Sequence, residues 1–256
     1  MKTVFINCSP KKRFSASAYF LFLQRLFTRG EKVTEKLRGP ADHARILEQL
    51  RDARAVVFFL PLYVDGISSH VLRFMELLEA FLRERDLHPS IYCVANNGVI
   101  EGKQCEPLMR SFGHFCARAG VPWGGGVGIG GGVMLNVTRI LFIVDVILLL
   151  VNTALSAVET GNFFPGDAWH SFGENAALLM YFNLGVLAYL IRQGRRITGG
   201  AAGGCRYTRI LIPSFIFILF ADIFFFIASL FGYYWRALHF DSEKVRHQKV
   251  FQLSQR

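Results

Sequence analysis

The chain has 256 residues, a formal net charge of +10 and an apolar composition, with 52% hydrophobic residues, 25 phenylalanines and a mean hydropathy of +0.32. Charged residues make up only 19% of the chain. A soluble domain has about a quarter, so we expect part of the chain to contact lipid. The basic residues of the first half are dispersed rather than gathered in a stripe, which argues against nucleic-acid binding despite the positive charge.

The first half of the chain alternates short apolar runs with amphipathic stretches. Strands are predicted at residues 3–9, 31–39, 54–63, 89–98 and 121–130. Helices are predicted at residues 16–27, 42–53, 68–86 and 103–120. Strands that alternate with helices of this length form a parallel sheet that is covered on both faces. The sequence therefore predicts an α/β domain over residues 1–132, with a flavodoxin-like, doubly wound five-stranded parallel sheet of strand order 2-1-3-4-5.

Three glycines near the end of this domain, Gly126, Gly128 and Gly131, have the G-x-G-x-x-G spacing of a dinucleotide-binding loop. That fingerprint must follow the first strand of the unit and open a helix, with an acidic residue about 20 positions later. Here the glycines follow the last strand, and the acid nearest to that distance, Asp145, lies in an apolar run. We therefore expect these glycines to form a strand end and a hinge, not a cofactor site.

Ligands of a doubly wound sheet bind at the carboxyl ends of its strands. The loops concerned are residues 9–17, 61–69 and 96–103. The first loop carries Ser9, Lys11, Ser15 and Ser17 and leads into a predicted helix. Hydroxyl groups, backbone N–H groups and the positive end of a helix together form an anion site that suits a phosphate, although the Walker pattern is absent. The alternative is a polar loop in which a serine only caps the helix.

The loop sequences INCSPKKRFSAS, PLYVDGISSH and VANNGVIEG follow one another in this order. With GVGIGGG in the place of the last strand, they resemble the flavin-contacting loops of the flavodoxin-like NAD(P)H-dependent FMN reductase family, over about residues 2–132. The resemblance implies an FMN cofactor whose phosphate is held by Ser9, Lys11, Ser15, Ala16 and Ser17. It also implies that Pro61, Leu62, Tyr63, Val64, Asp65 and Gly66 wrap the isoalloxazine ring, and that Asn96, Asn97 and Gly98 line its far edge. Many relatives have glycine in the place of Cys8 and arginine in the place of Lys11, and neither change removes a phosphate donor.

FMN accepts a hydride at its own N5 atom, so we expect no catalytic acid–base pair in the protein. Tyr63 is expected to stack on the flavin or cover it, and the alternative is an aromatic ring packed on the sheet edge. Asp65 and Gly66 can equally form a turn. His70 and His114 are expected to be structural, and the five cysteines to be reduced thiols, because no metal-ligand spacing is present.

The resemblance further implies NADPH or NADH as the electron donor, which the sequence does not distinguish. The acceptor would be a quinone, another flavin or a redox partner. A homodimer is also compatible with the family, because its members often complete the flavin site across an interface.

The second half, residues 133–256, is predicted to be a helical membrane region that ends in a basic tail. Candidate spans are residues 133–155, 176–191 and 210–235. Five arginines lie between the second and third spans, whereas the segment between the first two is acidic and aromatic. By the positive-inside rule, the arginine-rich loop and the N-terminal domain are expected in the cytoplasm. Three spans would place the basic tail outside. Three alternatives follow: the rule fails for this tail, a re-entrant hairpin forms near Pro213 and Asp222, or the helices lie in the interface or form a dimer core.

Two acidic residues fall inside the apolar runs, Asp145 and Asp222. Such a residue is a candidate proton relay, quinone contact or ion contact. The alternative is an ion pair with Arg139 or Arg209 that only fixes the packing of helices. The whole sequence predicts a membrane-anchored FMN-dependent oxidoreductase. Its alternative is a flavodoxin-like electron carrier, or a non-enzymatic interaction domain, attached to a membrane scaffold.

Overall fold

The computed structural model describes residues 1–11, 15–63, 66–164, 166–228 and 230. Contacts between residues divide the chain into two units, Met1–Leu211 and Ile212–Arg256. The first unit therefore continues well beyond residue 132, where the sequence places the end of the α/β domain. The difference arises because two later segments of the chain return to the sheet.

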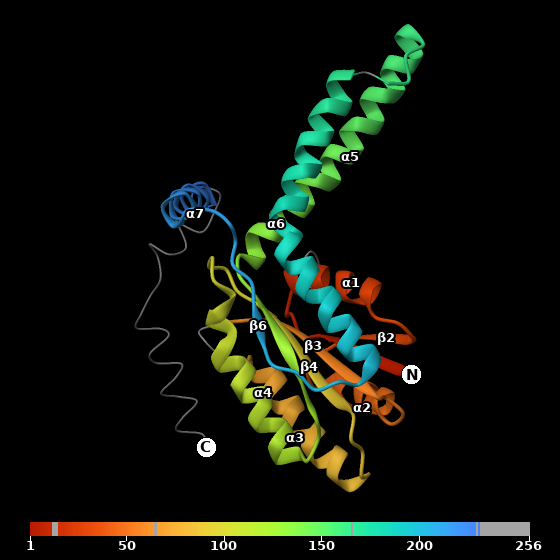
Figure 1. Ribbon diagram of the computed structural model, residues 1–256, viewed down its shortest axis with the longest axis vertical. Helices are drawn as coiled ribbons and strands as arrows, with labels where there is room; N and C mark the ends of the chain where they lie inside the picture. Colours follow the sequence, from red (N-terminus) through yellow and green to blue (C-terminus); the bar gives the residue numbers. More distant parts are fainter. Residues whose placement is uncertain (12–14, 64–65, 165, 229, 231–256) are drawn as a thin grey trace. The chain divides into compact units, whose positions relative to one another are not determined.

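A parallel sheet of six strands in the order β2-β1-β3-β4-β5-β6 forms the centre of the first unit (Figure 1). Its strands are β1 (Lys2–Asn7), β2 (Glu31–Lys36), β3 (Ala55–Pro61), β4 (Ser90–Asn96), β5 (Trp123–Ile129) and β6 (Arg206–Tyr207). The first five strands have the predicted flavodoxin-like order. The sixth strand is not predicted, because two residues are too few to show a periodic pattern. It pairs with β5, placing Arg206 opposite Val127 and Tyr207 opposite Gly128.

Helices cover both faces of this sheet. One face carries α2 (His43–Leu50), α3 (Ser69–Glu84) and α4 (Glu106–Ala119), with the short 3-10 helices η1 (Pro40–Asp42) and η2 (Gly102–Cys105). The other face carries α1 (Ala16–Phe27). Helix α4 begins three residues later than predicted, with Pro107 in its first turn, where the missing N–H interrupts no helical hydrogen bond. It ends, as predicted, at Gly120, which has the left-handed conformation.

Two long helices, α5 (Gly132–Thr160) and α6 (Gly166–Gly199), follow β5 and pack against each other as a hairpin that extends past the end of the sheet (Figure 1). Gly131, with a φ of 64°, marks the start of α5. The glycine-rich stretch thus forms a strand and the beginning of a helix, as predicted, and not a dinucleotide loop.

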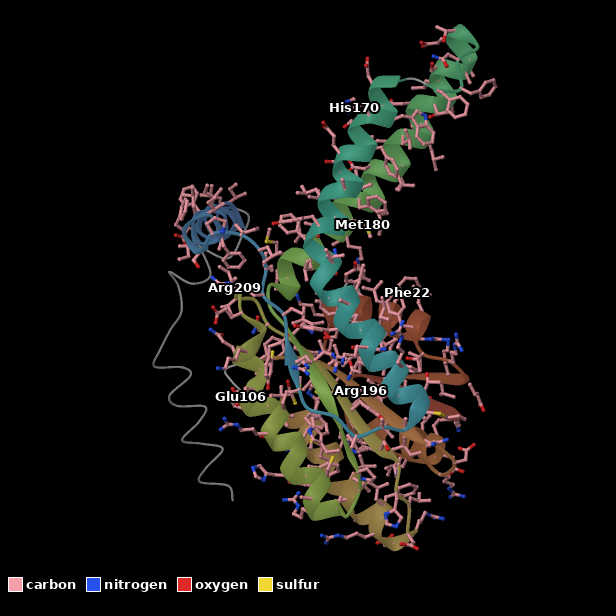
Figure 2. The ribbon with its side chains drawn as sticks, in the orientation of Figure 1. Phe22, Glu106, His170, Met180, Arg196 and Arg209 are labelled. Carbon is pink, nitrogen blue, oxygen red and sulfur yellow. The ribbon has the colours of Figure 1, made fainter. Side chains whose placement is uncertain are left out.

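The second half of α6 does not extend away from the sheet but packs on it beside α1. Its buried residues recur every three or four positions: Asn183, Val186, Leu190, Gln193, Gly194 and Ile197. At Gly194 a Cβ atom would overlap the carbonyl oxygen of Phe27, so only glycine allows α6 to approach α1 this closely. Figure 2 shows Met180 on the projecting half of α6 and Arg196 on the half beside the sheet. The predicted span at residues 176–191 therefore lies partly on the projecting half of α6 and partly, from Asn183, on the half that packs on the sheet.

The second unit contains the helix α7 (Ser214–Ala228). Its described side chains include exposed apolar groups such as Phe215 and Phe226. The predicted third span starts four residues earlier, at Ile210. That residue belongs instead to the first unit, where it is buried and its N–H donates to the carbonyl oxygen of Ile100. The end of that span and the basic tail lie outside the described residues.

Candidate functional site

The loop after β1 and the start of α1 form the predicted phosphate site. Ser15 is the N-cap of α1, and its Oγ accepts a hydrogen bond of 3.1 Å from the Ala18 N–H. The N–H groups of Ala16 and Ser17, in the same first turn, have no acceptor inside the helix. Ser9 is buried, and its Oγ accepts from the Lys11 N–H at 3.4 Å. These groups provide the donors and the positive helix end that an anion requires.

Asn96, the last residue of β4, joins two of the three predicted loops. Its Nδ2 donates to Ser17 Oγ at 3.0 Å and to the Leu60 carbonyl oxygen at 3.2 Å. Its own carbonyl oxygen accepts from the Leu62 N–H at 2.7 Å. The predicted site residues Ser17, Leu62 and Asn96 are therefore brought together at the carboxyl ends of neighbouring strands. The sequence shows Asn96 only as a loop residue, because this bond connects positions 79 residues apart.

The loop after β3 is described at Pro61, Leu62, Tyr63 and Gly66, whereas Val64 and Asp65 lie outside the described residues. Tyr63 and Gly66 form an antiparallel bridge, in which the Gly66 N–H donates to the Tyr63 carbonyl oxygen at 3.1 Å. The Tyr63 side chain is 45% exposed, so it is not packed away on the sheet edge. An exposed ring on a turn at the strand ends remains free to stack on a ligand.

Asn97 and Gly98, which follow β4, differ in their surroundings. Asn97 is buried, and its Nδ2 donates to the Glu101 carbonyl oxygen at 2.8 Å, so this side chain shapes the turn before α4. Gly98 is exposed. Helix α5 begins next to this turn, since the Gly132 N–H donates to the Asn97 carbonyl oxygen at 2.7 Å. The start of the hairpin is thereby fixed to one of the predicted flavin loops.

His70, predicted to be structural, links two of the loops. Its Nε2 lies 3.0 Å from the carbonyl oxygen of Cys8, which connects the first turn of α3 to the end of β1. Cys8 is fully buried, and this burial raises the pKa of its thiol far above the ordinary value. The His70 contact therefore ties two loops together, and the buried Cys8 thiol stays protonated at neutral pH.

Arg139 and Arg209, the candidate partners of the acidic residues in the apolar runs, contact other side chains in the described part of the chain. The Arg139 guanidinium lies over the ring of Tyr19, 5.0 Å from its centroid. Arg209 forms an ion pair of 3.6 Å with Glu101. No cluster of three His, Cys, Asp or Glu side chains that could hold a metal ion occurs in the part of the chain that is described.

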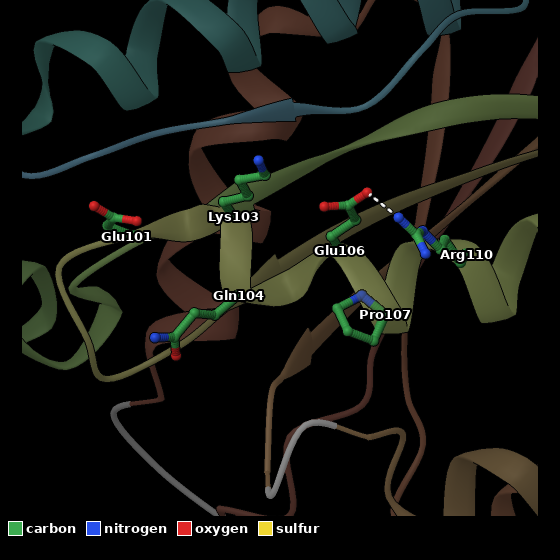
Figure 3. A pocket seen from close by; sticks show the side chains of 6 residues that line it. All are labelled: Glu101, Lys103, Gln104, Glu106, Pro107 and Arg110. Carbon is green, nitrogen blue, oxygen red and sulfur yellow. Dashed lines mark hydrogen bonds and ion pairs between the residues drawn. The ribbon is translucent and has the colours of Figure 1, made fainter.

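Two pockets lie on the first unit, and the first of them is lined in part by Glu101 and Lys103 of the predicted loop at residues 96–103. One, of about 510 Å³, is a surface hollow at the start of α4. Figure 3 shows its lining side chains, including the ion pair between Glu106 and Arg110 at 2.6 Å. The other, of about 520 Å³, lies between α1 and the base of the hairpin. The first is lined by carboxylate, cationic and amide side chains, with Pro107 beside them.

The sheet order and the polar ends of its strands define a flavodoxin-like α/β protein. The chain is similar to the Trp repressor binding protein from Bacillus subtilis, with 20% identity, a TM-score of 0.42, and coverage of 50% of this chain and 84% of that one. It is also similar to an FMN-dependent NADH-azoreductase from Bacillus anthracis in complex with FMN, with 15% identity, a TM-score of 0.34, and coverage of 47% and 82%. A second azoreductase from Bacillus anthracis matches over 78% of this chain and 99% of its own, with 11% identity and a TM-score of 0.41. No protein-family model and no curated protein matches the chain.

Proposed function

We propose that this protein is an FMN-dependent oxidoreductase that takes a hydride from NADPH or NADH and is held at a membrane by the α5–α6 hairpin. The observation that carries the proposal is the junction of Ser17 and Asn96, 3.0 Å apart, at the N-terminus of α1. This hydrogen bond connects the N-terminus of α1, whose first N–H groups have no acceptor inside the helix, to the ends of β3 and β4. A flavin mononucleotide needs such a combination, with an anion site at one end and a loop-lined surface at the other.

The phosphate would be held by backbone groups more than by side chains. The N–H groups of Ala16 and Ser17 point out of the first turn of α1, where the helix dipole favours negative charge. Ser9 and Ser15 would add hydroxyl groups, and Lys11 a positive charge. These donors would suit the dianionic phosphate of FMN.

When bound, FMN supplies the hydride chemistry through its own ring system. The chain's residues would bind and orient it. Pro61, Leu62 and Tyr63, with Val64, Asp65 and Gly66, would surround the ring, while the turn at Asn97 and Gly98 would border its far edge. Tyr63 can cover the ring from solvent because its side chain is exposed on a turn.

Association with a membrane is supported by the exposure of the hairpin. Both α5 and α6 are long and apolar enough to cross a membrane, but a buried core helix would pass the same test. The low burial of these helices supports the membrane, because only 6% of the most apolar window of α5 and 17% of that of α6 is buried. The large exposed side chains Leu141, Ile147, Leu150 and Leu155 would otherwise face water. Lipid would remove this apolar surface from water.

The packing of α6 limits how the hairpin can enter a bilayer. From Asn183 onward, one face of α6 is packed on α1 and the sheet, so this face cannot lie in lipid at the same time. The part of α6 left for insertion, residues 166–182, is about 26 Å long at 1.5 Å per residue. It also contains the ion pair of His170 and Glu174, at 3.6 Å, near the tip of the hairpin. We therefore place the α/β unit directly at the cytoplasmic surface, with no linker between it and the inserted part.

The electron acceptor would be a quinone, another flavin or a redox partner, and a homodimer remains compatible with the site. The second candidate function is a flavodoxin-like electron carrier or an interaction domain without enzymatic activity. It is favoured by the bonds that already occupy Asn96 and Asn97, since these side chains have structural partners of their own.

The experiment is a visible absorption spectrum of the detergent-purified protein before and after anaerobic NADPH or NADH. A flavin band that bleaches supports the oxidoreductase, and a band that stays oxidised supports the carrier. No flavin after incubation with FMN would contradict both the oxidoreductase and the electron carrier, and would leave the interaction domain. The site is tested by Ser15→Asp, which can still cap α1 but places a carboxylate where the phosphate would bind. Its control, Ser15→Asn, keeps the cap without the charge. We expect only Ser15→Asp to release flavin.

A further inference from the structure

A pocket of about 520 Å³ lies where α1 meets the base of the hairpin, apart from the flavin loops. Its walls are formed by seven residues: Ala18, Tyr19 and Phe22 of α1, Arg139, Phe142 and Ile143 of α5, and Leu179 of α6. Six of these seven side chains are apolar or aromatic. Phe22 is 59% exposed and Ile143 is 46% exposed, so the pocket opens to the surroundings of the hairpin.

Arg139 is the charged residue of this pocket, and it lacks an anionic partner. Its guanidinium lies over the Tyr19 ring, and its Nε is buried without a hydrogen-bond acceptor. No carboxylate in the part of the chain that is described forms an ion pair with it. The Tyr19 hydroxyl cannot serve as that partner, because it donates to Asn183 Oδ1 at 3.0 Å. A buried cationic N–H without an acceptor is costly, and an anionic ligand would satisfy it.

The position of Arg139 along α5 indicates where such an anion would come from. From Arg139 to the end of α5 at Thr160, the helix rises about 31 Å at 1.5 Å per residue. That length is close to the roughly 30 Å thickness of a bilayer's hydrocarbon core. With the hairpin inserted, Arg139 lies at the level of the lipid headgroups, next to the α/β unit.

We propose that this pocket binds one anionic phospholipid, whose headgroup phosphate pairs with the Arg139 guanidinium while an acyl chain lies against Phe22, Phe142 and Leu179. A guanidinium pairs with a phosphate through two parallel hydrogen bonds, which a neutral quinone carbonyl cannot offer. The lipid would attach α1 to the bilayer beside the residues that form the predicted phosphate site. This inference rests on the proposed membrane association of the hairpin and not on flavin binding.

The test compares the full-length protein with the variant Arg139→Gln in flotation with vesicles. One set of vesicles contains phosphatidylcholine alone, and the other contains phosphatidylcholine with phosphatidylglycerol. We expect the unchanged protein to prefer the anionic vesicles, and Arg139→Gln to lose roughly tenfold of that preference while still floating with neutral vesicles. The matched control is Arg195→Gln, which removes an exposed arginine of α6 outside the pocket and should retain the preference within about twofold.

A second variant, Leu179→Trp, fills the apolar part of the pocket and leaves the charge in place. Native mass spectrometry should then show loss of the co-purified phospholipid in both pocket variants, and an unchanged far-ultraviolet circular dichroism spectrum would confirm that they fold. An excess of inorganic phosphate at constant ionic strength should not displace the lipid. Displacement by phosphate would show a free-anion site and overturn the proposal. An equal preference for anionic vesicles in Arg139→Gln and Arg195→Gln would overturn the proposal too. So would dissociation of a dimer in Arg139→Gln without loss of bound lipid.

The outcomes separate this inference from the proposed function. If the pocket variants lose the lipid but keep their full flavin content, the lipid site is supported whether or not NADPH reduces the flavin. Failure of the full-length protein to float with either kind of vesicle would contradict the membrane association itself, and with it the lipid site. Flavin reduction measured in the same preparation would remain a separate result.

Discussion

The hydroxyl of Tyr19 donates a 3.0 Å hydrogen bond to Oδ1 of Asn183, a residue 164 positions further along the chain. Both side chains are buried, and Asn183 Nδ2 is satisfied by the Leu179 carbonyl oxygen at 2.8 Å. The bond therefore connects α1 to α6 at the level where α6 leaves the hairpin and joins the sheet. It fixes which turn of α6 begins to pack on the α/β unit.

Tyr19→Phe should lower the free energy of unfolding by about 1–3 kcal/mol, because it leaves the buried Asn183 oxygen without a donor. The measurement is denaturant unfolding of the detergent-purified protein. Tyr181→Phe is the control, because the Tyr181 hydroxyl donates to the Leu211 carbonyl oxygen at 3.2 Å from an exposed position. It should cost less than about 0.5 kcal/mol. Equal losses in the two variants would contradict a structural role for the buried bond.

Gly194→Ala should destabilise the protein by about 1–3 kcal/mol, since the added methyl group overlaps the Phe27 carbonyl oxygen and forces α6 away from α1. Gly185→Ala, also within α6, meets nothing within 4 Å of the added atom. That control should stabilise the helix by up to about 1 kcal/mol, because alanine has the higher helix propensity. Melting temperatures of both variants, measured in the same detergent, should move in opposite directions.

Stability should fall above about pH 9. Burial raises the pKa of Cys105 and of Cys116 from 9.0 to about 12 in the folded protein. A raised pKa means that the folded state keeps the proton which the unfolded state has already lost, so stability is complete below pH 9 and declines between pH 9 and pH 12. Unfolding free energies at pH 7, 9 and 10 check this trend. Cys116→Ala should decline less steeply over the same range, and an equal slope would count against burial as the cause.

Ile147→Lys combined with Leu148→Lys should prevent flotation with phosphatidylcholine vesicles while leaving the flavin content unchanged. These residues are 54% and 51% exposed on the projecting part of α5, where a charge in the hydrocarbon core is costly. Leu72→Lys is the control, because Leu72 is 45% exposed on α3, which covers the sheet. Flotation of the double variant would mean that the hairpin meets protein and not lipid.

The sequence predicts the α/β unit well because its signals are local. Strands β1, β3 and β4 each contain a run of apolar residues, and Gly120 ends α4 at the expected place. The site is predicted as three loops, but the link between Asn96 and Ser17 is not, since it depends on how distant strands are neighbours in the sheet. The sequence locates the ends of the strands. It does not show which residue forms a hydrogen bond with each side chain there.

The role of α6 is hidden for a related reason. Residues 176–191 have the composition of a membrane span, and their buried members, Asn183, Val186 and Leu190, become evident only beside α1. The sequence does contain a sign of this role. Asn183, Gln193 and Gly194 lie on one face of the helix, and a face in contact with lipid needs neither polar side chains nor a glycine that allows close packing. A prediction of membrane spans from length and mean hydropathy alone does not take the spacing of these residues into account.

The hairpin interrupts the α/β unit between β5 and the helix segment that covers it, and this order has a consequence during synthesis. When Ile129 leaves the ribosome, one face of the sheet is still covered by α1 alone. Asn183 follows only after the whole hairpin has been made, which takes roughly 3 to 11 s at ordinary elongation rates. During that interval Phe59, Tyr92 and Val94 lack the α6 side chains that later bury them. If the protein has the proposed function, the hairpin would therefore enter the membrane before α6 completes the α/β unit.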